Sequence, residues 1–436
     1  MKISEHVRYV GVNDLRGCLF ENQWSLPKGV SYNSYLVVDE KIALIDTAAA
    51  AFGAEFIENI KAEIGDRDID FLVVNHMEPD HSALMSVIRK EYPNIQIVTN
   101  AKAVPMIAGY QGITDNVKVI KEGERLSLGN LNLAFYMDPM VHWPETMVTF
   151  LEEEQTLFSG DAFGCFGALD ESITDGFPIY RDEMVRYYAS IVGKYGQPVQ
   201  TALKKLSNLS ISRICSTHGP IWESDINDVV SLYDRMSRYE TGKGVCIVYG
   251  SMYGNTEKAA KAIKDKLELN GINCVLHNAV EENPSFIYKD VFEYDMLICG
   301  APTYNNDIFP AVRNILYGVC ARMVKNIKFA SSPEWMQKRL RNAGIRPINN
   351  LVDITNFVML EYGQPMHAFD YDMLTGHEIV VKCASNGDIF QTLDGQERKL
   401  DDTVLMINDA EKAVGIAGIM GGENSKITEN VHTVVF

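Results

Sequence analysis

The chain has fewer positive than negative charges, no CxxC pair of cysteines and no long apolar run. Each of these absences excludes a class of protein. It has 40 lysines and arginines against 58 aspartates and glutamates, a net charge of −18. That balance argues against a surface built for nucleic-acid phosphates. No stretch approaches about 20 uninterrupted apolar residues, so no membrane span is predicted. The first residues, 1–6, lack an apolar core, and we expect no signal peptide.

The eight cysteines are scattered along the chain, and no two form a CxxC pair. Neither a disulfide framework nor a structural zinc site is therefore expected. Reduced thiols of this kind are typical of the cytoplasm, which is the location we predict. With 436 residues, 46% apolar and 22% charged, the chain should hold two or three globular domains.

The most informative feature is the run His76-Met77-Glu78-Pro79-Asp80-His81. Four ligand-type side chains in six residues cannot all reach one ion, but a loop can direct them towards two neighbouring ions. Further candidates follow later apolar runs, at His142, Asp161 and His218. Each histidine alone could be a hydrogen-bonded core residue. The cluster favours two metals with one carboxylate bridging them, because buried charges without a cation are costly.

Residues 1–243 show strands mixed with helices. Two apolar runs, 34–38 and 42–46, predict a hairpin. Residues 51–64 have helical periodicity, and 71–74 form a buried strand that leads directly into the histidine-rich run. The candidate ligands therefore follow strands of a sheet, where functional loops are commonly held.

A second pattern begins near residue 244. Strands are predicted at 245–249, 273–276 and 296–299, with a glycine-containing loop and a helix at 257–270 after the first. This alternation predicts a parallel, doubly wound sheet. It contains three strands and stops near residue 318, whereas such sheets usually have five.

Residues 1–243 resemble the metallo-β-lactamase-like domain of flavodiiron proteins. Hydrolases of that fold carry His-x-His-x-Asp-His with zinc, whereas here Glu78 stands in the second histidine position. An anionic oxygen ligand favours iron. The resemblance implies two irons, with His76, Glu78 and His142 on one, Asp80, His81 and His218 on the other, and Asp161 between them.

The implied reaction is reduction of dioxygen to water or of nitric oxide to nitrous oxide, with the metal ligands as the reactive site. Trp143, Phe163 and Phe166 could form an apolar wall, or could be ordinary core aromatics. A zinc hydrolase on the same fold is the alternative, which Glu78 and the attached second pattern disfavour.

Residues 244–319 resemble part of flavodoxin. The resemblance implies an FMN site built from two loops, namely Ser251, Met252, Tyr253, Gly254, Asn255 and Thr256, and Pro302, Thr303, Tyr304, Asn305 and Asn306. It also implies a rubredoxin-like electron donor and a head-to-tail homodimer. Because the later strands and the third flavin loop are missing, we expect incomplete FMN binding and an impaired relay.

Residues 320–436 resemble the editing-domain region of the phenylalanyl-tRNA synthetase β subunit, through 332–340, 344–350, 353–356, 363–370 and 417–422. By position, Thr355, Asn356 and His367 would belong to its editing pocket. Both matches are incomplete at their junction, which predicts a gene-fusion hybrid, and we expect no tRNA binding. An editing fragment without activity is therefore a further alternative.

The predicted fold class is a multidomain chain of α/β and α+β type. It combines a metallo-β-lactamase-like αββα sandwich, a partial flavodoxin-like doubly wound sheet, and an α+β fragment of the synthetase type.

Overall fold

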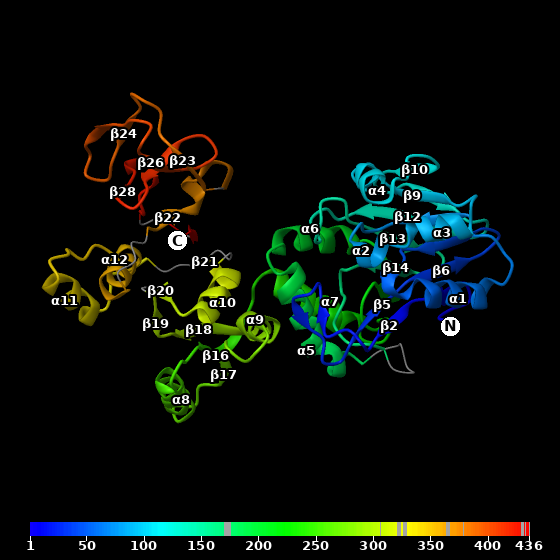
Figure 1. Ribbon diagram of the computed structural model, residues 1–436, viewed down its shortest axis with the longest axis horizontal. Helices are drawn as coiled ribbons and strands as arrows, with labels where there is room; N and C mark the ends of the chain where they lie inside the picture. The colour runs from blue at the N-terminus through cyan, green and yellow to red at the C-terminus, as the bar shows by residue number, and fades with distance from the viewer. Residues whose placement is uncertain are drawn as a thin grey trace. The chain divides into compact units, whose positions relative to one another are not determined.

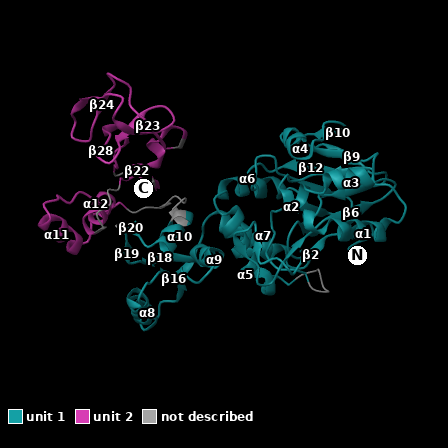
Figure 2. Ribbon diagram, viewed as in Figure 1, with its two compact units in different colours: residues 1–319 teal, residues 320–436 magenta. Residues whose placement is uncertain are grey.

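The computed structural model divides into two compact units, residues 1–319 and 320–436 (Figure 2). It describes residues 1–169, 176–305, 307–320, 324–325, 329–362, 367–377, 379–428, 431 and 433–435. Among these residues no helix is both long and apolar enough to cross a membrane.

The first part of unit 1 is a sandwich of two sheets (Figure 1, blue to green). The six-stranded sheet has the order β1 (Val7–Tyr9), β6 (Tyr35–Val38), β7 (Ile42–Ile45), β8 (Phe71–Val73), β9 (Gln96–Asn100) and β10 (Val117–Ile120). The five-stranded sheet has the order β11 (Arg125–Ser127), β12 (Asn132–Met137), β13 (Met147–Leu151), β14 (Thr156–Gly160) and β15 (Arg213–Ser216).

Strand β7 shows why the sheets are buried on both faces. Ile42 and Leu44 pack into the cluster under the outer helices, whereas Ala43 and Ile45 pack into the cluster between the sheets. Side chains alternate along a strand, so a continuous apolar run serves both layers. Strands β7, β8, β9 and β10 are parallel neighbours, and their carboxyl ends therefore lie at one edge.

Helices cover both outer faces of the sandwich. The six-stranded sheet is covered by α1 (Gly53–Ile64), α3 (Met85–Glu91) and α4 (Ala103–Gln111). The five-stranded sheet is covered by α5 (Phe177–Tyr187), α6 (Gly196–Leu206) and α7 (Ile226–Ser237). In α1 the buried side chains are Phe56, Ile60 and Ile64, at the spacing of one helix face. The predicted αββα sandwich is confirmed.

The second part of unit 1 is a parallel sheet with the order β17 (Cys274–Asn278), β16 (Gly242–Tyr249) and β18 (Tyr294–Gly300). Helix α8 (Asn255–Glu268) covers one face, and α9 (Pro284–Glu293) and α10 (Pro310–Cys320) cover the other. Within the described residues this sheet has three strands, so the predicted partial doubly wound sheet is confirmed. Two small antiparallel sheets pair β2 (Val12–Asp14) with β5 (Val30–Tyr32), and β19 (Thr303–Tyr304) with β20 (Asp307–Ile308).

Unit 2 has α+β structure. It contains helices α11 (Glu334–Asn342) and α12 (Asn350–Tyr362) and three small sheets. These are β21 (Val324–Lys325), β29 (Thr433–Val435) and β22 (Phe369–Asp370); then β23 (Val380–Cys383), β26 (Leu405–Asn408), β27 (Ala413–Ile416) and β28 (Met420–Gly421); then β24 (Ile389–Gln391) and β25 (Glu397–Lys399).

A buried ion-pair cluster links β17 to α9 and makes the stability of this part depend on pH. His277 Nδ1 lies 2.7 Å from Glu282, and Nε2 lies 2.8 Å from Asp290, with Lys289 also paired to Asp290. Burial by itself would lower the pKa of His277, but hydrogen bonds with Asp290 and Glu282 outweigh burial and raise it.

The protonated His277 is therefore favoured in the folded state. Its contribution is fully present below the unfolded pKa of about 6.5 and is lost as pH rises through the raised folded pKa. We expect His277→Gln to lower the unfolding free energy by about 2 kcal/mol at pH 6, and by less at alkaline pH. Urea unfolding at both pH values checks this, and an equal loss at both would contradict it.

Candidate metal centre

Seven side chains converge where the two sheets meet the connecting loops. His76 follows β8, Asp161 immediately follows β14, and His218 lies two residues after β15. His142 comes from the connection between β12 and β13. The run 76–81 is not entirely the predicted loop, because Pro79–Ser82 forms a short helix, α2. Proline suits the first helical position, and this turn carries Asp80 and His81.

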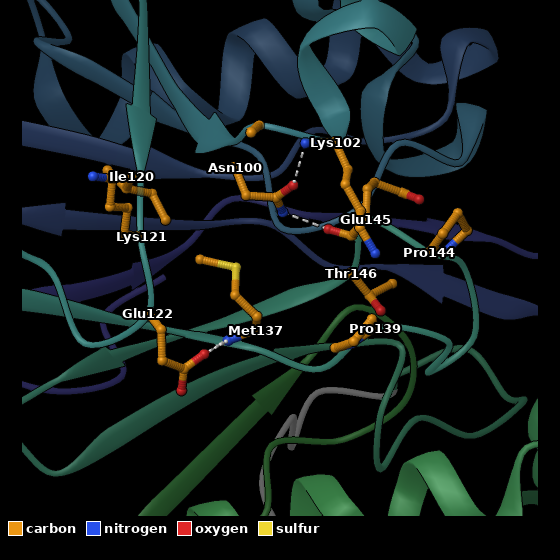
Figure 3. Close-up of a pocket in the computed structure, with 11 residues that line it drawn as sticks. Asn100, Lys102, Ile120, Lys121, Glu122, Met137, Pro139, Pro144, Glu145 and Thr146 are labelled. Atoms are coloured by element: carbon orange, nitrogen blue, oxygen red, sulfur yellow. Dashed lines mark hydrogen bonds between the residues drawn. The ribbon is translucent and has the colours of Figure 1, made fainter.

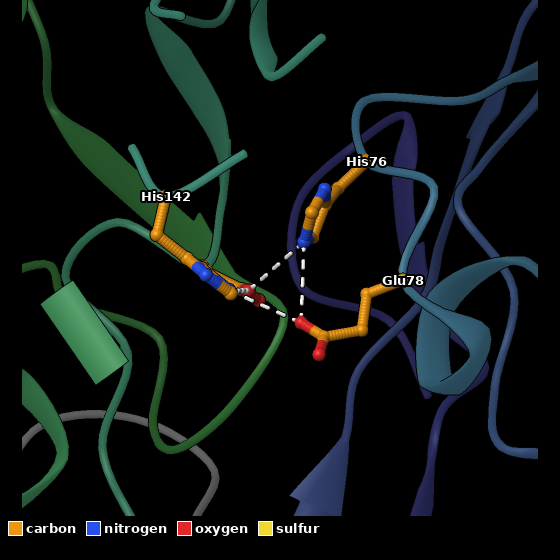
Figure 4. A group of neighbouring side chains, drawn as sticks. His76, Glu78 and His142 are labelled. Carbon is orange, nitrogen blue, oxygen red and sulfur yellow. Dashed lines mark hydrogen bonds and ion pairs between the residues drawn. The ribbon is translucent and has the colours of Figure 1, made fainter. Parts of the chain in front are cut away.

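The first group consists of His76, Glu78, His142 and Asp161. Glu78 Oε2 lies 3.3 Å from His76 Nε2 and 3.1 Å from His142 Nε2 (Figure 4). Asp161 Oδ2 lies 3.1 Å from His142 Nε2 and 3.5 Å from His76 Nε2. Figure 4 shows the rings of His76 and His142 and the carboxylate of Glu78 facing one point.

The second group consists of Asp80, His81 and His218. Asp80 Oδ2 lies 3.3 Å from Nε2 of each histidine. The other oxygen of Asp161, Oδ1, lies 2.9 Å from His81 Nε2 and 3.7 Å from His218 Nε2. Asp161 therefore presents one oxygen to each group.

The donor set fits metal ions better than hydrogen bonds among the side chains. Both oxygens of Asp80, both ring nitrogens of His81 and Nε2 of His218 are buried and make no hydrogen bond with the described residues. Ligands held about 2.1 Å from a common ion stand about 3.0 to 3.4 Å from one another, as most of these atoms do. Buried polar atoms without partners are costly, and a cation in each group would satisfy them.

Residues around the ligands fix their orientation. Glu145 Oε1 lies 2.8 Å from His76 Nδ1, and the carbonyl of Ser31 lies 2.7 Å from His218 Nδ1. Thr217 Oγ1 donates to Asp161 Oδ1 at 2.6 Å. Such contacts select the ring nitrogen that faces the metal. Glu145 was not predicted as a site residue; its place three residues after His142 was the available signal in the sequence.

The site is strongly acidic and favours the charged form of His76 and His142 when no metal competes. Burial would lower the pKa of His76, but hydrogen bonds to Glu145 and Glu78 and the charge of Asp161 raise it to about 10. The pKa of His142 is raised to about 10 against the same opposing effect of burial, by Asp161 and Glu78. The carboxylates of Glu145, Glu78 and Asp161 are thus stabilised by positive charge beside them. Metal ions would supply that charge when they displace the protons of the histidines.

Aromatic rings enclose the centre. Trp143 lies edge-on to His76, with 5.1 Å between ring centroids, on the side of the first group. Phe166 packs edge-on against the buried Tyr187, with 5.1 Å between ring centroids, and Phe163 packs on Tyr233 instead. The Tyr187 ring lies 5.5 Å from that of His218. Its hydroxyl is buried without a hydrogen-bond partner among the described residues.

The pKa of Tyr187 is raised well above its usual value by burial and by the charges of Asp161, Asp80 and Glu78. It stays a hydrogen-bond donor beside the ligands. No local motif marks Tyr187 in the sequence, because it comes from α5.

A cavity of about 280 Å³ is lined in part by Glu145, the hydrogen-bond partner of His76 (Figure 3). Its lining includes Lys102, Lys121, Glu122, Met137 and Glu145. Asn100 Nδ2 donates to the Glu145 carbonyl at 2.5 Å and so fixes this wall. Glu145 thus belongs both to this cavity and to the support of His76.

The two predicted flavin loops lie side by side, because they follow the paired strands β16 and β18 and Gly250 N donates to Gly300 O at 2.9 Å. Gly254, with a φ of 82°, precedes α8, whose first turn has no side-chain cap. Uncapped N–H groups suit a phosphate. Tyr253 is 87% exposed, and Tyr304 is 46% exposed. Asn306 lies outside the described residues.

The three predicted editing-pocket residues are not joined by hydrogen bonds within the described part of unit 2. Thr355 Oγ1 donates to Val352 O within α12, at 2.8 Å, and Asn356 follows on the same helix. The His367 ring packs on Phe369 at 4.6 Å, and its Nε2 is buried without a partner there. Burial lowers the pKa of His367.

Three family models match the chain: ODP family beta lactamase over 30–219, flavodoxin over 247–326 and B3/4 domain over 317–436. The chain is 32% identical to a nitric oxide reductase of Moorella thermoacetica, over 74% of this chain and 83% of that protein. It is similar to rubredoxin oxygen:oxidoreductase of Desulfovibrio gigas, with 30% identity and a TM-score of 0.71 over 73% of this chain and 82% of that one. For a variant of the flavo-diiron protein of Thermotoga maritima the identity is 30% and the TM-score 0.69, over 74% and 82%.

The sandwich and its neighbouring sheet thus define a metallo-β-lactamase-like domain joined to a flavodoxin domain. The chain belongs to the flavodiiron protein family, a family of oxidoreductases, and carries a B3/4 domain at its carboxyl end.

Proposed function

We propose that the chain reduces nitric oxide to nitrous oxide, or dioxygen to water, at a two-iron centre in the sandwich domain. The observation that carries this proposal is the division of seven ligand-type residues into two groups, with one oxygen of Asp161 facing each. His76, Glu78 and His142 would hold one iron, Asp80, His81 and His218 the other, and Asp161 would bridge them. Glu78, an anionic oxygen ligand, favours iron over zinc.

Two irons held there would act as Lewis acids and supply electrons to a bound diatomic molecule. The protein's own residues prepare the reaction. Glu145 holds the ring of His76, and Thr217 holds the carboxylate of Asp161. Trp143 excludes water on the side of His76. The Tyr187 hydroxyl can donate a hydrogen bond to the substrate, whose reduction consumes protons.

Electrons would reach the centre through FMN at the loops 251–256 and 302–306. The uncapped start of α8 and the paired loops fit the phosphate and ring of a flavin. A rubredoxin-like donor, as the name of the Desulfovibrio gigas relative suggests, a head-to-tail homodimer and a cytoplasmic location complete the proposal. With three strands in the described sheet, we propose that the flavin is held weakly.

For unit 2 we propose descent from the editing domain of the phenylalanyl-tRNA synthetase β subunit, which agrees with the B3/4 domain match. The chain would then be a hybrid of two gene fragments. We propose that unit 2 neither edits nor binds tRNA; among the described residues no hydrogen bond unites Thr355, Asn356 and His367.

The proposal is tested by measuring iron, zinc and FMN in one anaerobically purified sample, followed by nitrous oxide formation from nitric oxide. We expect close to two irons per chain, little zinc, substoichiometric FMN, and slow turnover with reduced rubredoxin. Reconstituted zinc without iron, with no gas reduction, would instead support the hydrolase alternative.

A further inference from the structure

A small hairpin lies between the metal centre and the flavodoxin domain of the same chain. It pairs β3 (Leu19–Phe20) with β4 (Trp24–Ser25). Glu21 and Asn22 at its turn have φ of 49° and 56°, which permits a tight reversal. Phe20 and Trp24 are both buried, so the hairpin is packed on two sides.

The inner side of the hairpin contacts one ligand from each metal group. The Phe20 ring lies 5.1 Å from the His218 ring, at 88° to it. At the turn, Trp24 Nε1 donates to Glu21 Oε2 at 2.9 Å, and the Glu21 carboxyl lies beside that of Glu78. The hairpin is therefore a wall shared by both groups.

The outer side of the hairpin rests on α9. The rings of Trp24 and Tyr288 lie 6.0 Å apart, nearly edge to face. Asn283 Nδ2 donates to the carbonyl of Gln23 at 2.9 Å, while Asn283 Oδ1 accepts from Ser285 N and so caps α9.

A buried arginine reinforces the same junction. Arg186 Nη1 donates to the Ser25 carbonyl at 2.7 Å and to Ser285 Oγ at 2.9 Å. Its guanidinium lies between the rings of Phe166 and Phe286, 4.3 and 4.6 Å from their centroids. Planar stacking with directed donors fixes an arginine firmly.

We infer that α9 of the flavodoxin domain holds the β3–β4 hairpin against the metal centre of its own chain, with Phe20 and Trp24 as positioning residues for His218 and Glu78. The flavodoxin domain then supports the metal site mechanically, with or without flavin. Contacts behind metal ligands restrict ligand orientation and so set how tightly the metal is held. This inference rests on the proposed two-iron site.

The test measures the rate at which iron leaves the full-length, anaerobically loaded protein in excess chelator. Trp24→Phe keeps an aromatic ring but removes the donor to Glu21. Asn283→Asp keeps the cap of α9, since aspartate is a good N-cap, but removes the donor to Gln23. We expect both variants to load iron like the wild type and to release it about tenfold faster, equally with and without added FMN.

The matched control is Val291→Ala, which weakens the packing of α9 on its sheet but does not face the hairpin. It should release iron at the wild-type rate. Wild-type release rates in both hairpin variants, or equally fast release in Val291→Ala, would overturn the inference and leave the two-iron site standing. A wild-type chain that binds no iron would overturn both.

Discussion

Replacing Asp161 by alanine is expected to remove most of the iron from the chain. Its Oδ1 lies 2.9 Å from His81 Nε2, and its Oδ2 lies 3.1 Å from His142 Nε2. One substitution therefore removes a ligand from both groups and the only carboxylate that links them among the described residues. Loss even of an outer contact weakens metal binding about 10- to 100-fold, so a lost bridge should cost at least the larger factor.

The measurement is iron per chain by elemental analysis after anaerobic loading and desalting. We expect less than about half of the wild-type content. Asp138→Asn is the matched control, because Asp138 is also buried in the sandwich domain, and burial raises its pKa well above the usual range. That change removes a neutral carboxyl and should leave iron unchanged. Wild-type iron in Asp161→Ala would refute the bridging role.

The second large effect is expected for Tyr187→Phe. The ring packs against Phe20, Phe166 and His218, and phenylalanine can keep this packing. Only the buried hydroxyl is lost, and it has no hydrogen-bond partner among the described residues to leave behind. A single donor directed at a reacting group is worth about 100-fold or more in kcat. We therefore expect kcat for nitric oxide reduction to fall about 100-fold, with KM and iron content little changed.

The assay should use a chemical reductant, so that weak flavin binding does not limit the rate. Tyr92→Phe is the control, because Tyr92 is buried and its hydroxyl is also without a partner among the described residues. Its charged neighbours are Lys61, Glu91 and Asp68, none of them a proposed ligand. Equal kcat values for Tyr187→Phe and Tyr92→Phe would show that the Tyr187 hydroxyl takes no part.

The sequence predicted the strands well and marked the side chains that the structure brings together in two groups, because both are local signals. Apolar runs such as 42–46 marked buried strands, and the spacing within 76–81 brought the ligand types together. The supporting residues could not be predicted in the same way. Glu145 contacts a histidine 69 residues earlier, and the carboxylates near Tyr187 include Asp80 and Glu78, more than 100 residues earlier. Such neighbours are brought together only once the two sheets have packed.

The same limit applies to the hairpin at residues 19–25. Its two-residue strands are too short for a periodic pattern, and its role depends on α9, more than 250 residues later. One local detail of the prediction was wrong. Pro79 begins the helical turn α2, whereas an irregular loop was predicted there.

Strand β18 affects how the protein behaves at high concentration. Among the described residues its one neighbour in the sheet is β16, and Met296 on it is 54% exposed. An outer strand with an apolar side chain and little charge is a template on which another chain can add a strand. Colloidal stability, more than folding stability, should therefore set the highest concentration at which this protein can be handled, and a charged residue in place of Met296 is the natural remedy.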